Sequence, residues 1–204
     1  GASSRLKTMD RKTVVSTIRR FNKDTAGGIS GYNGGIIKVL SSSEVLADLI
    51  GDMAKHIATG TLSFRDFFTS SRLIPLRKPN GKIRPVAVGD TLFRLATKVV
   101  LRTVKPNLAL NQFGVGTPLG CEPMVHHLRE VAKTHSIIGL DLSNAFNSMT
   151  RKSILEALTE LAPELIPLFL WSYGNKSGLH TQGKVIYSRS GERQGDPMGP
   201  LLFS

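Results

Sequence analysis

One acidic residue follows an apolar run in the segment IIGLDLSNAFNS (137–148). We expect Ile137 to Leu140 to form a strand that presents Asp141 at its C-terminal end, with Phe146 close behind it. Mg²⁺ prefers oxygen ligands and is usually held by one or two carboxylates plus substrate phosphates, so Asp141 is a candidate metal ligand. The ring of Phe146 could shape the sugar pocket of a nucleotide. Taken alone the segment is ambiguous, because Asp also commonly closes a strand into a turn.

A second chemically suggestive segment is RLIPLRKPNGKIRPVAVGD (72–90). The pattern predicts a β-hairpin with strands over 73–76 and 83–88 and a turn at Pro79-Asn80-Gly81. The basic residues that flank the turn are Arg77, Lys78, Lys82 and Arg84. Such a ribbon can close over a triphosphate, with Lys as a point charge and Arg as a bidentate fork. The alternative is that the charges only protect an edge strand from aggregation.

The third segment is RQGDPMGP (193–200). Asp196 is a natural N-cap and Pro197 a natural first-turn residue, so a final helix is expected to begin there. A helix start does not explain the preceding residues. Gln194 can both donate and accept hydrogen bonds, and Gly195 lets the backbone approach a ligand closely.

Positive charge is concentrated in one part of the chain. The 204 residues carry a net charge of +12, and nine basic residues but one acid lie between Arg72 and Lys105. A helix capped by Asp90 or Thr91 and closed by Pro106 is expected to carry a basic stripe. The residues of this stripe are Arg94, Lys98, Arg102 and Lys105. The excess favours a polyanionic partner, most simply nucleic acid, and the alternative is a solvated basic face.

Composition narrows the class of protein. The 40% hydrophobic and 21% charged content is that of a folded domain, or of two small ones. No run of eighteen apolar residues exists, so no membrane association is expected. The single cysteine, Cys121, excludes an internal disulfide and favours a reducing, intracellular setting. The first three residues, Gly-Ala-Ser, are expected to be a cloning remnant.

The remaining patterns predict a mixture of helices and hairpins. We expect a helix over 12–21, an irregular glycine-rich loop over 26–35, and a capping box of Ser41 and Glu44 before a helix that Gly60 ends. Further expected elements are a helix through Val131, helices over 150–161 and 164–173, and a hairpin over 179–189. This mixed order indicates an α+β fold.

The three chemical segments resemble, in order, blocks of the reverse transcriptase family. LRKPNGKIRPVAVGDTLFRLATK is similar to the first fingers block, and KDTAGGISGYNGG (23–35) to the block before it. IIGLDLSNAF resembles polymerase motif A, and RQGDPMGPLLF resembles motif B. The similarity covers roughly residues 10–204 and is greatest to non-LTR retrotransposon polymerases, which are related to group II intron maturases. It implies an RNA-directed DNA polymerase that works with Mg²⁺, an RNA template, a DNA or RNA primer and dNTPs.

The resemblance assigns roles residue by residue. Asp141 would be the motif A metal ligand, with the backbone carbonyl of Leu142 as its companion, and Phe146 would be the steric gate against a 2′-hydroxyl. Lys78 and Arg84 would contact the incoming triphosphate, and Arg77 could replace Lys78 because the turn leaves the register open. Gln194 and Gly195 would line the nucleotide pocket near the sugar and base.

The resemblance also implies a right-hand polymerase fold that consists of fingers and part of the palm. In this division, residues 1–95 and 150–190 are fingers, 96–149 are the first part of the palm, and 191–204 begin the motif B helix. The setting would be nuclear if the element is eukaryotic.

Two departures from the family pattern matter. Asn147 stands where many relatives have an acid, which we take as tolerable variation. Motif C, a Tyr-x-Asp-Asp hairpin, is absent, and a two-metal phosphoryl transfer needs carboxylates that bridge both ions. The chain is therefore expected to be an N-terminal piece, inactive without the remainder of the polymerase.

Two alternatives stay open. One is a domesticated, non-catalytic reverse-transcriptase-like scaffold that binds RNA, and the other is a basic RNA-binding module with fortuitous motifs. The presence of Asp141, Phe146 and Gln194 together argues against a scaffold, which needs none of them. A Tyr-x-Asp-Asp motif further along the gene would support the polymerase.

Overall fold

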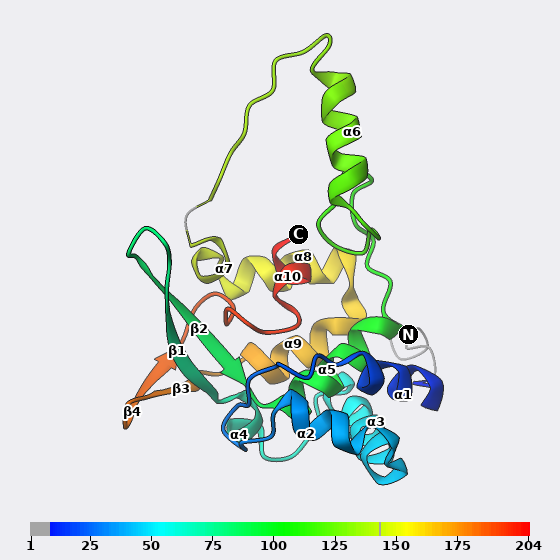
Figure 1. The fold of residues 1–204 in the computed structure, drawn as a ribbon, viewed down its shortest axis with the longest axis vertical. Helices are drawn as coiled ribbons and strands as arrows, with labels where there is room; N and C mark the ends of the chain where they lie inside the picture. Colours follow the sequence, from blue (N-terminus) through cyan, green and yellow to red (C-terminus); the bar gives the residue numbers. More distant parts are fainter. Residues whose placement is uncertain (1–8, 143) are drawn as a thin grey trace.

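A computed structural model describes residues 9–142 and 144–204 as a mixed α+β fold, as the element order predicts (Figure 1). The Gly-Ala-Ser start and Ser143 lie outside the described residues. The helices are α1 (Arg11–Arg20), α2 (Gly34–Val39), η2 (Leu40–Ser42), α3 (Glu44–Ala58), α4 (Arg65–Thr69), α5 (Thr91–Thr103), α6 (Cys121–Val131), α7 (Ala145–Ser148), α8 (Arg151–Leu161), η3 (Pro163–Leu165), α9 (Ile166–Tyr173) and α10 (Gly199–Phe203). The strands are β1 (Ser71–Arg77), β2 (Ile83–Gly89), β3 (Ser177–Thr181) and β4 (Lys184–Ser188).

A helical core holds the molecule together. Apolar residues at helical spacing on α1, α3, α5 and α9 are buried against one another, among them Ile18, Ile50, Val99 and Leu168. Burying a large aliphatic side chain stabilises the fold by about 1.5–3 kcal/mol, so this cluster supplies the main driving force. In the part of the chain that the structure describes, no helix combines the length and apolar character needed to cross a membrane.

Side-chain caps determine where several helices begin. Asp90 accepts hydrogen bonds from the amides of Leu92 and Phe93, which confirms it as the cap of α5. The predicted capping box at Ser41 is wrong. Ser43 caps α3 by accepting from Leu46 N, because residues 40–42 form the 3₁₀ turn η2 and the helix starts after it.

The glycine-rich loop ends earlier than the sequence suggests. Residues 26–35 were expected to be irregular throughout, but α2 begins at Gly34. Asn33 caps it by accepting from Ile36 N at 3.0 Å. A side chain at Gly34 would collide with the carbonyl of Asn22, so the helix start packs directly on backbone. Gly34 is therefore required by the close contact between the start of α2 and the backbone at Asn22.

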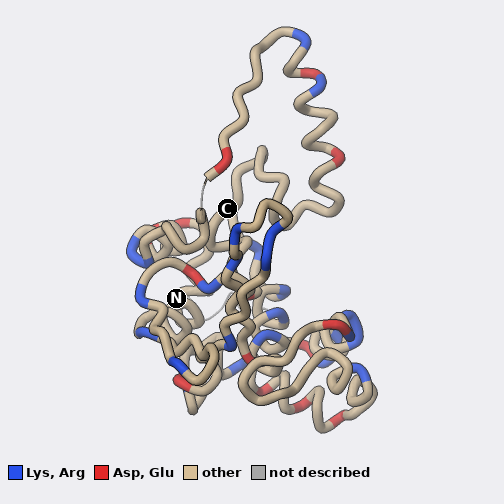
Figure 2. The backbone as a smooth tube through the Cα atoms, turned by 60° about the vertical axis from the view of Figure 1, so that its left-hand side comes forward, with Lys and Arg blue, Asp and Glu red and all other residues tan. Residues whose placement is uncertain are grey.

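The sheet has the strand order β2-β1-β3-β4, and it contains both predicted hairpins. The β1–β2 hairpin pairs over its whole length, from Ser71↔Gly89 to Arg77↔Ile83. By contrast, β1 and β3 pair in parallel only at Ser71↔Leu179 and Arg72↔His180, so the two hairpins then diverge. Figure 2 shows Lys and Arg on both strands just below the tip of the long hairpin.

An arm made of α6 and its flanking segments rises from the body (Figure 1). The returning segment includes Ile137–Leu140, which the sequence predicted to be a strand. That prediction is wrong in this structure, because no described strand pairs with the segment. Ile138 is 84% exposed and Leu140 is 88% exposed, so the apolar run stays extended without the ladder that would bury it.

Candidate functional site

A cavity of about 700 Å³ lies between the basic hairpin, the start of α7 and the C-terminal turn. Six of the residues proposed from the sequence line it: Lys78, Arg84, Asp141, Leu142, Phe146 and Gln194. They come from three segments that are far apart in the chain. The fold therefore assembles most of the predicted nucleotide site in one place.

Arg84 and Gln194 are hydrogen-bonded to each other at the wall of this cavity. With the amide oriented to satisfy both neighbours, Oε1 of Gln194 accepts from Nε and Nη2 of Arg84, each at 2.9 Å. Nε2 then donates to the carbonyl of Pro85 at 2.8 Å. The carbonyl of Gln194 also accepts from Ala87 N at 2.9 Å. These contacts lock the C-terminal turn to β2 and hold the Arg84 guanidinium at the cavity wall.

The remaining two nucleotide-site candidates lie elsewhere. Arg77 ends β1 opposite Ile83 and does not line the cavity, so its neighbour Lys78 is the better placed of the two. Gly195 has φ +114°, and a Cβ there would come within 2.8 Å of the Ala87 carbonyl. The absence of a side chain at Gly195 therefore allows the turn to approach the β2 backbone closely. This glycine does not shape the cavity.

Phe146 sits at the opposite wall of the cavity. It is half-buried and packs on Phe203 of α10 with ring centroids 5.2 Å apart. Its carbonyl accepts from Glu192 N at 3.0 Å. A Cβ at Gly191 would lie 2.5 Å from the Asn147 carbonyl, so the C-terminal turn also fits tightly against α7. The turn thus joins the hairpin wall to the Phe146 wall.

Asp141 offers the cavity an exposed carboxylate next to the carbonyl of Leu142. Two oxygen donors suit one Mg²⁺, which typically keeps several waters and takes further ligands from substrate phosphates. They do not suit two ions. Across residues 9–142 and 144–204, no three His, Cys, Asp or Glu side chains are grouped closely enough to hold a metal.

The turn that carries Gln194 rests on a buried ion pair that sequence reasoning missed. Asp196 was expected to cap the final helix; α10 begins only at Gly199, and Oδ1 of Asp196 accepts from Met198 N at 3.0 Å in the turn before it. Its Oδ2 pairs with Arg193 at 3.0 Å and accepts from the Tyr173 hydroxyl at 2.7 Å. Arg193 also donates to the Thr69 carbonyl at 2.9 Å. The i, i+3 spacing of Arg193 and Asp196 was the one available signal.

Glu192 is a second buried acid beside this pair. Its side chain has no hydrogen-bond partner among the described residues. Burial first, and then the nearby charge of Asp196, raise the pKa of Glu192 to about 8. The folded protein therefore keeps this carboxyl protonated at pH values where the unfolded chain has lost the proton.

This pKa shift gives a prediction for stability. Because the folded state holds the proton of Glu192 and the unfolded state releases it near pH 4.5, stability should fall as pH rises from there to about 8. Glu192→Gln should remove that fall, which amounts to a few kcal/mol, roughly, by linkage. Urea unfolding of both proteins between these pH values measures it, and parallel stability curves would contradict it.

The predicted basic stripe is only partly as expected. Lys105 lies beyond the end of α5, which stops at Thr103 and not at Pro106. Arg94 is half-buried and donates to the Ala26 carbonyl at 3.3 Å. Desolvation lowers the pKa of this guanidinium below its usual value, although the nearby charges of Asp196 and Asp90 partly oppose the shift.

The other two members of the stripe stay exposed but contact α1 and its C-terminal end. Lys98 lies over the Phe21 ring, 5.1 Å from its centroid, and Arg102 donates to the Thr17 hydroxyl at 2.8 Å. These contacts give the stripe a packing role, because the residues join α5 to α1. Binding of nucleic acid by Arg94, Lys98, Arg102 and Lys105 stays a prediction.

Comparisons with known proteins agree on one family. The profile described as "Reverse transcriptase (RNA-dependent DNA polymerase)" matches residues 76–204. The "Retrotransposable element SLACS 132 kDa protein" of Trypanosoma brucei gambiense is 31% identical over 211 residues, which cover 96% of this chain and 18% of that protein.

Two further relatives are similar over shorter stretches. The "Retrovirus-related Pol polyprotein from type-1 retrotransposable element R2" of Nasonia vitripennis is 37% identical over 87 residues, 40% of this chain and 8% of the relative. Its counterpart in Popillia japonica is 26% identical over 137 residues, 59% of this chain and 19% of the relative. The chain thus spans less than a fifth of each of these proteins.

Proposed function

The chain belongs to the reverse transcriptase family, and we propose that it forms the nucleotide-binding part of an RNA-directed DNA polymerase that adds dNTPs to a primer 3′ end on an RNA template. The observation that carries this proposal is the cavity in which Lys78, Arg84, Asp141, Phe146 and Gln194 meet. The cations suit the triphosphate of a nucleotide, the carboxylate suits a metal ion bound to the phosphate oxygens, and the aromatic ring suits the sugar.

The hairpin side of the cavity would bind the triphosphate. Lys78 and Arg84 are exposed and cationic, and a guanidinium can donate to two phosphate oxygens at once. Gln194 holds Arg84 by its Nε and Nη2, which leaves Nη1 for the substrate. Pre-orienting a flexible side chain in this way lowers the entropy lost on binding.

The opposite side would hold the metal and the sugar. Asp141 and the Leu142 carbonyl would hold Mg²⁺, which when bound neutralises charge that develops during phosphoryl transfer. Phe146 would exclude a 2′-hydroxyl, since its ring packs on Phe203 of α10 and its backbone carbonyl is held by Glu192 N of the C-terminal turn. A two-ion mechanism needs further carboxylates, and we propose that they come from residues outside this chain.

The same reasoning suggests the place of this chain in a larger enzyme. We take the β1–β2 hairpin and the helices beneath it as fingers, and the segment from Asp141 to Phe146 with the C-terminal turn as palm. RNA template, primer and the remainder of the polyprotein are the partners that this placement requires.

A change of sugar specificity tests the proposed role of Phe146. In the full-length protein, Phe146→Val should raise ribonucleotide incorporation relative to deoxynucleotide incorporation about 10- to 100-fold, because the smaller side chain leaves room for a hydroxyl. Primer extension on an RNA template with each nucleotide type measures the ratio. Phe113→Val, the same change on the arm, is the control. An unchanged ratio in Phe146→Val would remove the gate assignment.

A further inference from the structure

A second set of hollows lies apart from the candidate active site, around the β3–β4 hairpin. One, of about 580 Å³, lies beside α8 and α9; the next, of about 910 Å³, lies between α4 and β3–β4; the third, of about 760 Å³, fills the fork between β1 and β3. The first two share Asn175 and Lys176, and the last two share His180 and Val185. The three hollows thus adjoin one another along the β3–β4 hairpin, and together they are here called the β3–β4 track.

Charge along the β3–β4 track is almost entirely positive. Its exposed basic residues are Arg72, Lys152, Lys176, Lys184 and Arg189. Among the described residues that line it, Asp66 is the single acid, and Arg65 neutralises it at 2.9 Å. A surface with this charge attracts a polyanion. None of these residues lines the cavity at Asp141.

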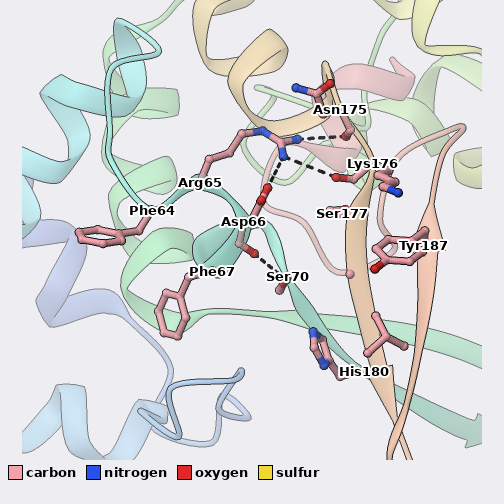
Figure 3. Close-up of a pocket in the computed structure, with 12 residues that line it drawn as sticks. Phe64, Arg65, Asp66, Phe67, Ser70, Asn175, Lys176, Ser177, His180 and Tyr187 are labelled. Atoms are coloured by element: carbon pink, nitrogen blue, oxygen red, sulfur yellow. Dashed lines mark hydrogen bonds and ion pairs between the residues drawn. The ribbon is translucent and has the colours of Figure 1, made fainter.

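Exposed aromatic rings lie on both sides of the central hollow, as Figure 3 shows, with Phe64 and Phe67 on the α4 side and Tyr187 on the strand side. Phe64 and Phe67 project from the α4 side and are 80% and 45% exposed. Phe64 holds a left-handed backbone conformation, φ 58°, which is unusual for a residue with a bulky side chain. On the β4 side Tyr187 is 48% exposed, and Lys176 lies 4.4 Å from its ring centroid.

The floor of the β3–β4 track is fixed by internal hydrogen bonds. Arg65 donates to the carbonyls of Trp171 at 2.7 Å and Asn175 at 3.0 Å. Arg151 donates to the carbonyls of Tyr173 at 2.8 Å and Asn175 at 3.3 Å. These two guanidiniums hold the turn that carries Lys176. The cations left for a ligand are therefore displayed on a pre-formed surface.

We propose that the β3–β4 track binds single-stranded RNA independently of the candidate active site. Lysines and arginines would follow the phosphates while unpaired bases stack on Tyr187 and the phenylalanines, the combination by which proteins hold single strands without reading sequence. In a duplex the bases are already stacked on one another and cannot enter the hollows. The aromatic rings therefore select single strands over duplex.

Charge reversal tests the proposed contacts between the basic residues and the RNA phosphates. The triple variant Lys176→Glu, Lys184→Glu, Arg189→Glu should bind a labelled RNA of about 12 nucleotides at least about tenfold more weakly. The slope of log affinity against log salt should fall by about 2, since each lost phosphate contact on a single strand contributes about 0.7. The matched control is Lys12→Glu, Lys55→Glu, Lys133→Glu, which changes net charge equally away from the β3–β4 track. Fluorescence anisotropy without Mg²⁺, primer or dNTP gives both quantities.

A pair of substitutions at Tyr187 tests the proposed stacking of bases on its ring. Tyr187→Leu should weaken single-strand binding about tenfold, because stacking on one ring contributes roughly that much, whereas Tyr187→Phe should bind like the wild type. Because Tyr187 faces solvent, neither substitution should disturb the core, and circular dichroism checks that the fold is retained. The affinities for single-stranded RNA and single-stranded DNA of the same sequence are compared to distinguish the two kinds of strand. The affinity for duplex RNA should not change in Tyr187→Leu.

Three results would overturn the proposal: equal weakening by the control triple, full binding by the β3–β4 triple, or equal effects of Tyr187→Leu on single strands and duplex. If the variant Lys176→Glu, Lys184→Glu, Arg189→Glu binds RNA as tightly as the wild type, the surface would instead be assigned to a protein partner. Photocrosslinking of 4-thiouridine RNA offers an independent check, since crosslinks should map to peptides over 176–189. Because these assays contain no dNTP, their outcome is independent of whether Asp141 and Phe146 have the roles proposed above.

Discussion

Asp141→Ala in the full-length protein is expected to abolish Mg²⁺-dependent DNA synthesis on an RNA template. Asp141 supplies the carboxylate that the described residues bring to the cavity beside Lys78 and Arg84. A bound ion contributes several kcal/mol of charge stabilisation to phosphoryl transfer, so its loss should slow synthesis about a thousandfold or more. Primer extension over a range of Mg²⁺ concentrations measures the loss.

The control for this prediction keeps binding separate from chemistry. RNA affinity should be nearly unchanged in Asp141→Ala, because the phosphate contacts proposed for the β3–β4 track lie elsewhere. Asp24→Ala, which removes an exposed acid in the N-terminal loop, should synthesise DNA at the wild-type rate. Synthesis by Asp141→Ala at a rate near that of the wild type would exclude Asp141 as a metal ligand.

Asp196→Ala is expected to destabilise the fold by about 3–5 kcal/mol, because it leaves the Arg193 guanidinium buried without its counter-ion. The side chains of Arg193 and Asp196 are 4% and 3% exposed, so water cannot replace the lost partner. Tyr173 would also lose the acceptor of its hydroxyl. Such a loss is a large share of the total stability of a domain, typically about 5–15 kcal/mol.

Guanidinium chloride unfolding measures this effect. Asp196→Asn should lose less, because an amide oxygen can still accept from Arg193 and Tyr173. Asp24→Ala, an exposed acid, should stay within about 0.5 kcal/mol of the wild type. If Asp196→Ala unfolds at the same denaturant concentration as Asp24→Ala, the buried pair does not stabilise this fold.

Local patterns predicted those elements whose ends are set by short-range chemistry. The β1–β2 hairpin follows from alternating residues around Pro79-Asn80-Gly81, and the starts of α5 and α8 follow from the side chains of Asp90 and Thr150. Each of these contacts joins residues that are neighbours in the chain, so the residue types are sufficient to specify them.

Two expectations depended on tertiary contacts that the local pattern does not show. Ile137–Leu140 has the composition of a strand, but a strand also needs a neighbour, and no described strand supplies one. Asp196 has the composition of an N-cap, and its Oδ1 does accept from Met198 N, but its Oδ2 pairs with Arg193 and accepts from the hydroxyl of the distant Tyr173. Residue type was informative in both cases, and tertiary packing decided the outcome.

The sequence by itself determined the chemistry: the family, the order of its motifs, and a short group of candidates around Asp141, Phe146, Arg84 and Gln194. Only the tertiary structure decided that Arg84 and Gln194 are hydrogen-bonded to each other and that Gly195 allows the C-terminal turn to approach the β2 backbone. It also decided that the β3–β4 hairpin forms a separate basic surface. The reason is physical. Motifs reflect which atoms a reaction requires, whereas the distance between segments depends on burial and backbone contacts across the whole chain, which no local pattern contains.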